Sequence, residues 1–311
     1  MGWEQGMLTD SGGFQMVSLL DLADITEEGV TFQSPIDGER MLLTPERSIA
    51  IQNDIGADII MALDDVVSSV ADDPERFAEA THRTLRWMDR CIAAHARPHD
   101  QALFAIVQGG LDSKLRRICL DGLLARGDRI PGYAVGGLAG GEDKNLFWRV
   151  VDQCCKELPA DKPRYVMGVG YPMDIVICSA LGADMYDCVY PTRTARFGTA
   201  LVPSGVLKLT QASMATDTRP IDEECGCTTC QNYTRAFLHT IARKEPAAGQ
   251  LISVHNIAYM SRFTAEMRAA ITDGTFPSYV RAFVARHYPD GDVPTWVRDP
   301  LEAAGIPLDD R

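Results

Sequence analysis

The stretch Met185-Tyr-Asp-Cys-Val-Tyr-Pro-Thr-Arg-Thr-Ala-Arg-Phe-Gly198 joins an apolar and aromatic run to a basic loop. Residues 185–189 have the composition of a buried strand, yet Asp187 lies within them. An ionised carboxylate is costly to bury without partners, so a buried strand seldom carries one without a use. A proline, two arginines and a glycine follow. We therefore expect a strand-end site for a substrate that develops positive charge and carries phosphates.

Similar apolar runs recur along the chain and alternate with amphipathic stretches. Each is near-continuously apolar, as expected of a parallel strand covered on both faces, and they are residues 58–63, 102–107, 132–135, 164–167 and 185–189. Thr44-Pro45 and Asp73-Pro74 each place an N-cap residue before a proline at the first helical position. Further helices are predicted over residues 113–126, 145–158 and 173–181.

Polar and glycine residues follow these strands. They are Asp64-Asp65, Gln108-Gly-Gly110, Gly136-Gly137, Gly168-Val-Gly170 and Asp187. So many polar strand ends converge on one site only when the strands form a ring, which favours a (β/α)8 barrel over a doubly wound sheet. A doubly wound sheet would favour one glycine-rich turn after an early strand, and no G-x-G-x-x-G occurs there.

The composition limits the class of protein. With 311 residues and 46% hydrophobic content, the chain can form one large domain, or a domain with a small module. No stretch approaches the roughly 20 apolar residues of a membrane span, and the start does not resemble a signal peptide. Six scattered cysteines lack the spacing of a disulfide scaffold. We expect a soluble, cytoplasmic protein, with peripheral attachment to the mitochondrial outer membrane as the alternative.

The net charge of −13 argues against nucleic-acid binding through a global basic field. Cations nevertheless gather in one part of the sequence, which predicts a local basic face. They are Arg193, Arg196, Lys208, Arg219, Arg235, Arg243 and Lys244. Scattered solvated charge is the alternative interpretation.

A cysteine cluster marks a second region. Cys225, Cys227 and Cys230, followed by His255, provide the ligands of a closed tetrahedral zinc site. Four protein ligands leave no open position, so we predict one structural Zn²⁺; His239 is the alternative fourth ligand, and reduced packing cysteines are the alternative to a metal site. We expect residues 201–250 to form a zinc module, with a helix over residues 232–244. Residues 1–200 and 251–311 would form the barrel domain.

Carboxylates near the strand ends suggest acid-base and nucleophilic chemistry. Asp10, in Thr9-Asp-Ser-Gly-Gly-Phe-Gln15, joins Asp64, Asp65 and Asp187 as a candidate, although Asp-Ser-Gly-Gly is also good turn chemistry. One carboxylate as nucleophile and another as acid/base suit a sugar C1′ that passes through an oxocarbenium-like state. Gln108 can read a nucleobase edge, because its amide both donates and accepts; pairing with backbone is the alternative.

With these residues assembled, the chain resembles the tRNA-guanine transglycosylases, and among them the eukaryotic catalytic subunits that insert queuine. The matching motifs are Asp10-Ser-Gly-Gly-Phe-Gln15, Asp64-Asp-Val66, Ile106-Val-Gln-Gly-Gly110, Gly136-Gly-Leu-Ala-Gly-Gly-Glu142, Met167-Gly-Val-Gly170, Asp187-Cys-Val-Tyr-Pro-Thr-Arg193 and the cysteines with His255-Asn256. The resemblance implies a barrel with an inserted zinc module. It also implies exchange of guanine for a 7-deazaguanine base at the wobble position of tRNA.

The resemblance also implies a role for each matching residue. Asp187 would attack C1′ and hold the ribose covalently, and Asp10 would take the proton from the incoming base. The purine edge would be read by Asp64, Gln108, Gly137 and Leu138. Phe14 and Met167 would sandwich the ring, while Arg193 and Arg196 would hold the RNA beside the anticodon uridines.

One position bears on which base is inserted. Bacterial relatives that take a smaller precursor typically carry valine where this chain has Gly140, which would leave room for the cyclopentenediol of queuine. Val66, in place of a cysteine common in bacterial members, points the same way. The implied partners are queuine, tRNA with a GUN anticodon and a paralogous non-catalytic subunit, with a homodimer as the alternative; DNA is not expected.

One departure concerns the start of the chain. The Asp10 motif comes almost at once, whereas family members carry the first barrel strands before it. We therefore expect a barrel without its N-terminal strands, and an inactive truncated form is an alternative. A non-catalytic partner subunit is a second alternative, but such subunits lose the nucleophile, whereas this chain retains Asp187. A zinc hydrolase is disfavoured because the metal would be fully coordinated. Archaeosine-forming relatives are disfavoured as well, because they usually carry a C-terminal RNA-binding domain, for which no residues remain after Arg311.

Overall fold

The computed structural model describes residues 3–13, 24–34, 36–242 and 244–308. The chain divides into two compact units. The first comprises Met1–Met167 with Leu181–Tyr186, and the second comprises Gly168–Ala180 with Asp187–Arg311.

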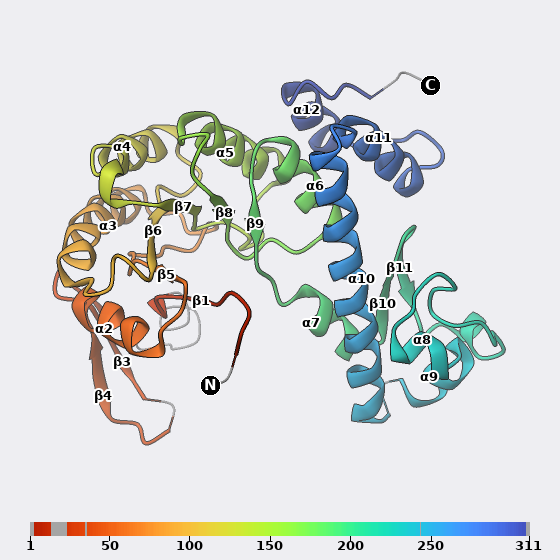
Figure 1. Cartoon of the computed structure of the whole chain (residues 1–311). Helices are drawn as coiled ribbons and strands as arrows, with labels where there is room; N and C mark the ends of the chain where they lie inside the picture. Colours follow the sequence, from red (N-terminus) through yellow and green to blue (C-terminus); the bar gives the residue numbers. More distant parts are fainter. Residues whose placement is uncertain (1–2, 14–23, 35, 243, 309–311) are drawn as a thin grey trace. The chain divides into compact units, whose positions relative to one another are not determined.

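The first unit contains a curled parallel sheet that forms half of a barrel (Figure 1). Its strands, in spatial order, are β1 (Leu8–Thr9), β5 (Ile59–Met61), β6 (Ala102–Val107), β7 (Gly132–Val135), β8 (Arg164–Val166) and β9 (Met185–Tyr186). Every neighbouring pair is parallel. The expected (β/α) barrel-like architecture is confirmed, and the described residues form half of such a barrel.

Side chains alternate between the two faces of this sheet, and both faces are buried. One face carries a cluster made of Met61, Phe104, Ile106, Ala134 and Tyr165. The alternate residues of β6, Leu103, Ala105 and Val107, are also buried. Burial on both faces explains why the sequence of β6 is apolar throughout rather than alternating.

Helices cover the outer face of the sheet (Figure 1). They are α2 (Pro45–Ile55), α3 (Pro74–Ala94), α4 (Ser113–Leu124) and α5 (Lys144–Glu157), with a short 3₁₀ turn, η1 (Gly127–Arg129). The two predicted N-caps are confirmed: Thr44 accepts a hydrogen bond from the Arg47 amide, and Asp73 accepts one from the Arg76 amide. These caps fix where α2 and α3 begin, directly after the strand-end loops.

The strand predicted over residues 185–189 is shorter than expected. It ends at Tyr186, and Asp187 is exposed rather than buried. Within the described part of the chain β9 is an edge strand that pairs only with β8. Residues beyond Tyr186 therefore lack a second neighbouring strand, and Val189 is 53% exposed.

A small antiparallel sheet in the first unit was not predicted. It consists of β2 (Asp24–Ile25), β3 (Val30–Gln33) and β4 (Arg40–Leu43). Trp87 of α3 donates a hydrogen bond to the Glu27 carbonyl at 2.9 Å, so the connection between β2 and β3 is held against that helix.

The second unit is mainly helical. It contains α6 (Pro172–Ala180), α7 (Tyr190–Arg196), β10 (Thr199–Val202), β11 (Gly205–Lys208), η2 (Ala212–Met214), α8 (Thr228–Asn232), α9 (Arg235–Ile241), α10 (Pro246–Thr272), α11 (Phe276–His287) and α12 (Thr295–Ala303). Residues from α7, β10, α9, α10 and the connections after β11 and η2 share one core: Ala195, Ala200, Leu209, Ile221, Leu238 and Ile252.

Helix α10 differs from the sequence-based expectation. It runs without interruption from Pro246 to Thr272, so His255 lies inside it. The predicted module boundary after residue 250 also falls within α10, and the division into domains stays a prediction. Among the described residues, no helix is both long and apolar enough to cross a membrane.

Candidate functional site

Asp64 and Gln108 meet at the ends of neighbouring strands. Both are buried, and Gln108 Nε2 donates a hydrogen bond to Asp64 Oδ2 at 2.6 Å. Burial, together with the nearby charges of Asp10 and Asp65, raises the pKa of the Asp64 carboxyl to about 7, against the hydrogen bond from Gln108. The two predicted base-reading residues therefore form one unit.

Asp10 follows β1 and is exposed. Its Oδ1 accepts a hydrogen bond from the Ser11 amide at 2.8 Å, which orients the carboxylate at the start of the turn. Its charge contributes to the raised pKa of Asp64. The structure thus brings Asp10 and Asp64 to the same strand-end region.

Asp65 has a different environment from Asp64. Its carboxylate is buried and bound by two arginines of α3: Arg76 forms an ion pair, and Arg83 Nη1 lies 2.6 Å from Oδ2. The Asp65 amide also donates to the Thr84 hydroxyl at 3.1 Å. Asp65 therefore anchors the strand end to α3 and is not offered to a ligand.

The glycine-rich loop after β7 lies against Gln108. A Cβ added at Gly137 would lie 2.4 Å from Gln108 Oε1, so only glycine permits this approach. Gly137 also has φ of 67°, where side chains are disfavoured. Leu138 is the next residue, so both predicted loop positions lie at the base-reading pair.

Glu142 holds this loop, a role that sequence reasoning did not assign. Its carboxylate accepts hydrogen bonds from the Ala139 amide at 2.7 Å, the Gly140 amide at 2.9 Å and the Ser69 hydroxyl at 2.7 Å. A Cβ added at Gly140 would lie 2.5 Å from Ser69 Oγ. The sequence could have indicated this role, because Glu142 is the last residue of the glycine-rich motif that begins at Gly136.

Met167 and Phe14 are the two residues predicted to cover the faces of the base. Met167 follows β8 and is half-buried; its Sδ would lie 3.6 Å from a Cβ added at Gly136. Met167 therefore lies beside the glycine-rich loop. Phe14 lies outside the described residues.

Arg116 holds the ends of β6 and β7 together, a role that the sequence did not indicate. This fully buried side chain of α4 donates to the carbonyls of Val107 at 2.7 Å, Gly110 at 2.8 Å and Gly136 at 2.8 Å. Burial lowers the pKa of the guanidinium. An arginine on an otherwise amphipathic helix looks like a solvated residue in sequence, so only the fold exposes its role.

Asp187 opens the second segment of the second unit. Its Oδ1 accepts a hydrogen bond from the Gly168 amide at 2.8 Å, although the carboxylate is exposed. The expectation of a buried carboxylate was wrong, for the reason given by the edge strand. A backbone amide directed at one oxygen orients the carboxylate.

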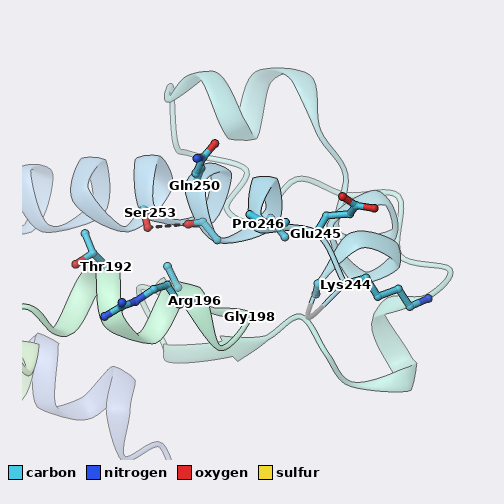
Figure 2. A pocket seen from close by; sticks show the side chains of 12 residues that line it. Thr192, Arg196, Gly198, Lys244, Glu245, Pro246, Gln250 and Ser253 are labelled. Carbon is cyan, nitrogen blue, oxygen red and sulfur yellow. Dashed lines mark hydrogen bonds between the residues drawn. The ribbon is translucent and has the colours of Figure 1, made fainter.

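Arg193 and Arg196 lie on α7, one turn apart and both exposed. Arg196 borders a cavity of about 930 Å³ between α7 and the start of α10 (Figure 2). Lys244 also borders it, but in Figure 2 its side chain points away from Arg196. Most of the remaining lining is small, so the cavity itself does not concentrate positive charge.

The four predicted metal ligands come together. The donor atoms of Cys225, Cys227, Cys230 and His255 all lie within 4.8 Å of one another. His255 Nδ1 is 3.3 Å from Cys230 Sγ and 3.7 Å from Cys227 Sγ. A tetrahedral zinc ion with Zn–S of about 2.3 Å and Zn–N of about 2.0 Å requires about 3.5 Å between such atoms, so the donor set fits.

The other nitrogen of His255 fixes its tautomer. Nε2 lies 2.8 Å from the Leu201 carbonyl, which can only accept, so Nε2 carries the proton and Nδ1 is left to bind a metal. Burial lowers the pKa of His255, which favours the neutral ring that a ligand requires. His239, the alternative ligand, instead lies 2.7 Å from the Leu209 carbonyl.

Asn256 links this cluster to α7. Its Oδ1 accepts from the Leu201 amide at 2.8 Å, so His255 and Asn256 together bind both backbone groups of Leu201. Its Nδ2 donates to the carbonyls of Pro191 at 2.9 Å and Thr199 at 3.1 Å. The residue after a metal ligand thus holds the helix that carries the two arginines.

Comparison with known proteins agrees with this arrangement. The family model described as queuine tRNA-ribosyltransferase matches residues 1–289. The queuine tRNA-ribosyltransferase catalytic subunits of Caenorhabditis briggsae and Schizosaccharomyces pombe are each 49% identical, over 99% and 98% of this chain and 80% and 77% of their own lengths. The queuine tRNA-ribosyltransferase of Thermus thermophilus is 48% identical over 98% of this chain and 78% of its own. By its fold, its strand-end residues and these matches, the chain belongs to the queuine tRNA-ribosyltransferase family.

Proposed function

We propose that this chain exchanges guanine for queuine at the wobble position of tRNAs with a GUN anticodon, through a covalent intermediate on Asp187. The observation that carries the proposal is the buried Asp64–Gln108 pair beside the glycine-rich loop. Such a pair combines an amide, which donates and accepts, with a carboxyl group, and a guanine-like edge requires both donors and acceptors. Membership of the family supplies tRNA as the substrate.

The proposed chemistry uses two carboxylates in turn. An Asp187 oxygen attacks C1′ of the ribose as the bond from C1′ to the guanine N9 breaks, and the departing guanine takes a proton from the Asp10 carboxyl. Asp10, now ionised, then takes the N9 proton of the incoming base, whose nitrogen attacks C1′ and releases Asp187. The hydrogen bond from the Gly168 amide occupies one oxygen of Asp187 and supports the other as nucleophile.

The base would lie against the first unit's strand ends. Asp64 and Gln108 would read its edge together with backbone groups of Gly137 and Leu138. Phe14 and Met167 would cover its two faces. Arg193 and Arg196, exposed on α7, would bind the RNA.

Queuine is favoured as the incoming base by position 140. Overall identity does not decide this point, because eukaryotic and bacterial relatives match almost equally well. The surroundings of Gly140 support queuine instead: a Cβ added there would lie 2.5 Å from Ser69 Oγ, so a larger residue would not fit without displacing Ser69. A glycine here keeps the loop away from a bulky substituent of the base.

The remaining assignments follow from the family and the metal cluster. Zn²⁺ is the proposed metal, because three thiolates and one imidazole form its usual closed site. It would be structural, since the protein fills all four positions. We further propose a heterodimer with a paralogous subunit, a homodimer being the alternative, and a cytoplasmic location.

Base exchange can be followed directly. Transfer RNA carrying labelled guanine would be mixed with queuine, with and without a partner subunit, and label release would be compared for the unsubstituted chain and Asp187→Ala. The proposal expects release by the unsubstituted chain and none by the variant. Equal release by both would remove Asp187 as the nucleophile. Intact tRNA binding without release under any condition would favour a non-catalytic, tRNA-positioning role.

A further inference from the structure

Two short segments of the second unit lie side by side next to Asp187. They are joined at one end by the hydrogen bond from the Gly168 amide to Asp187. Three residues further along each segment, the rings of Tyr171 and Tyr190 are in contact, with centroids 4.2 Å apart and planes tilted by 42°. The same loop that orients the proposed nucleophile therefore also presents an aromatic pair.

The close approach of the segments depends on a glycine. A Cβ added at Gly170 would lie 2.2 Å from Cys188 Sγ and 3.2 Å from Tyr190 Cβ. Tyr190 is the first residue of α7 and precedes a proline, which restricts its backbone. The position of the aromatic pair relative to Asp187 is thus fixed by backbone contacts at both segments.

The outer ring of this pair is accessible. Tyr171 is 54% exposed, whereas Tyr190 is half-buried behind it. The exposed side of α7 continues with Arg193, Arg196 and Phe197, the last being 67% exposed. A single exposed aromatic residue needs no explanation. An aromatic ring supported by a second ring, beside exposed arginines, has the composition of a surface that binds unpaired nucleotides.

We propose that Tyr171, supported by Tyr190, stacks on a tRNA nucleobase adjacent to the nucleotide whose base is exchanged. The inference rests on the proposed function. A group that attacks C1′ needs the target nucleotide removed from its stack, and the neighbouring base then loses a stacking partner. The ring of Tyr171, three residues after the glycine that donates to Asp187, replaces that stacking partner. Tyr171 is a positioning residue in this role and does not touch the reacting atoms.

Fluorescence of 2-aminopurine tests the stack. The probe would replace each nucleotide flanking the target guanine in an anticodon stem-loop, and the unsubstituted chain is expected to quench it at one of these positions. Tyr171→Ala should abolish that quenching and weaken RNA binding about 5- to 150-fold, the range expected for loss of one base stack. Tyr171→Phe keeps the ring and should stay within about twofold of the unsubstituted chain.

Comparing KM for tRNA with KM for guanine distinguishes the loss of a stacking contact from a general structural effect. Tyr171→Ala should raise KM for tRNA while leaving KM for guanine unchanged. Ile271→Ala is the matched control, because it removes an equally exposed apolar side chain from the far end of α10. Metal content and thermal unfolding would verify that each variant is folded.

The outcomes distinguish this inference from the proposed function. Unchanged quenching and binding in Tyr171→Ala, with base exchange intact, overturns the stack alone. Absence of base exchange by the unsubstituted chain overturns the proposed function, while the quenching experiment still reports on the stack. An equal loss in Tyr171→Phe would assign the effect to the hydroxyl and also overturn stacking.

Discussion

Gln108 donates its side-chain amide to the Asp64 carboxylate, with 2.6 Å between Nε2 and Oδ2, at the end of two neighbouring strands. Because burial raises the pKa of Asp64 to about 7, the carboxyl changes its charge near neutral pH. The pair can therefore present either a protonated or an ionised group to a ligand. Two pH-dependent consequences follow, one for base binding and one for stability.

Binding of guanine should strengthen as pH rises toward 7. The N–H groups on a guanine edge require an acceptor; because Asp64 Oδ2 already accepts from Gln108, protonation of Oδ1 would turn the remaining oxygen into a donor. Below about pH 7, KM for guanine at saturating tRNA should fall about tenfold per pH unit, and above it KM should level off. Asp64→Asn should remove this dependence. A pH-independent KM in the unsubstituted chain would contradict the assignment.

The stability contribution of Asp64 should have the opposite pH dependence. Its folded-state pKa, about 7, lies above the reference value of 3.8, so the folded state binds the proton more tightly. This contribution is complete below about pH 4 and is lost as pH rises through 7. The free energy of unfolding, relative to Asp64→Asn, should fall by up to ~4 kcal/mol between these limits, as measured by urea titration.

The sequence predicted those features that depend on local pattern. Strand β6 was identified correctly because it is buried on both faces and therefore apolar throughout. The N-caps Thr44 and Asp73 were identified because a cap acts on residues within its own turn. The four residues of the metal cluster were identified from residue type and spacing, and the structure brings them together.

Features that depend on distant neighbours were not predictable in this way. Asp64 and Asp65 are adjacent in sequence, and only the arginines of α3 make one structural and leave the other for a ligand. Burial of Asp187 was predicted from the composition of its strand, but exposure depends on how many strands flank it. Arg116 gave no signal, because its partners are backbone carbonyls and carry no side-chain pattern.

Replacing Arg116 should disturb base binding and stability together. Arg116→Met removes a donor from three carbonyls, but the Val107 carbonyl still accepts from the Gly136 amide at 3.1 Å, so only those of Gly110 and Gly136 lose the donor described for them. Because an unsatisfied buried carbonyl costs about 1–3 kcal/mol, we expect a loss of ~2 kcal/mol or more in the free energy of unfolding, and a higher KM for guanine in the folded fraction. Arg117→Met is the matched control on the same helix: this arginine is itself 58% exposed and pairs with the half-buried Glu157, so its removal should cost less than removal of the fully buried Arg116. Equal effects in both variants would refute the support role.

Enlarging Gly140 should discriminate between bases. Gly140→Val would force Ser69 to move and would fill space beside the base, so kcat/KM for queuine should fall at least about tenfold more than for guanine. Adding Ser69→Ala removes the hydroxyl that a new Cβ would meet and should restore folding without restoring queuine use. Undiminished queuine incorporation by Gly140→Val would contradict the size argument.

We expect the hydrogen bonds of Asn256 to couple the metal cluster to the position of α7. Asn256→Asp keeps an acceptor for the Leu201 amide but loses the donors to Pro191 and Thr199. KM for tRNA should therefore rise about tenfold or more, since loss of donors to buried carbonyls costs about 1–3 kcal/mol each, while KM for guanine changes little.

Metal removal by a chelator provides the second arm of this test. Without a metal, His255 no longer fixes Leu201, so the same hydrogen bonds from Asn256 weaken. Chelation should then raise KM for tRNA in the unsubstituted chain and have a smaller further effect in Asn256→Asp, because both changes act on one connection. Ile257→Ala, at the exposed neighbouring position of α10, should respond to chelation as the unsubstituted chain does. Fully additive effects of chelation and Asn256→Asp would show that the metal and α7 are not coupled through this residue.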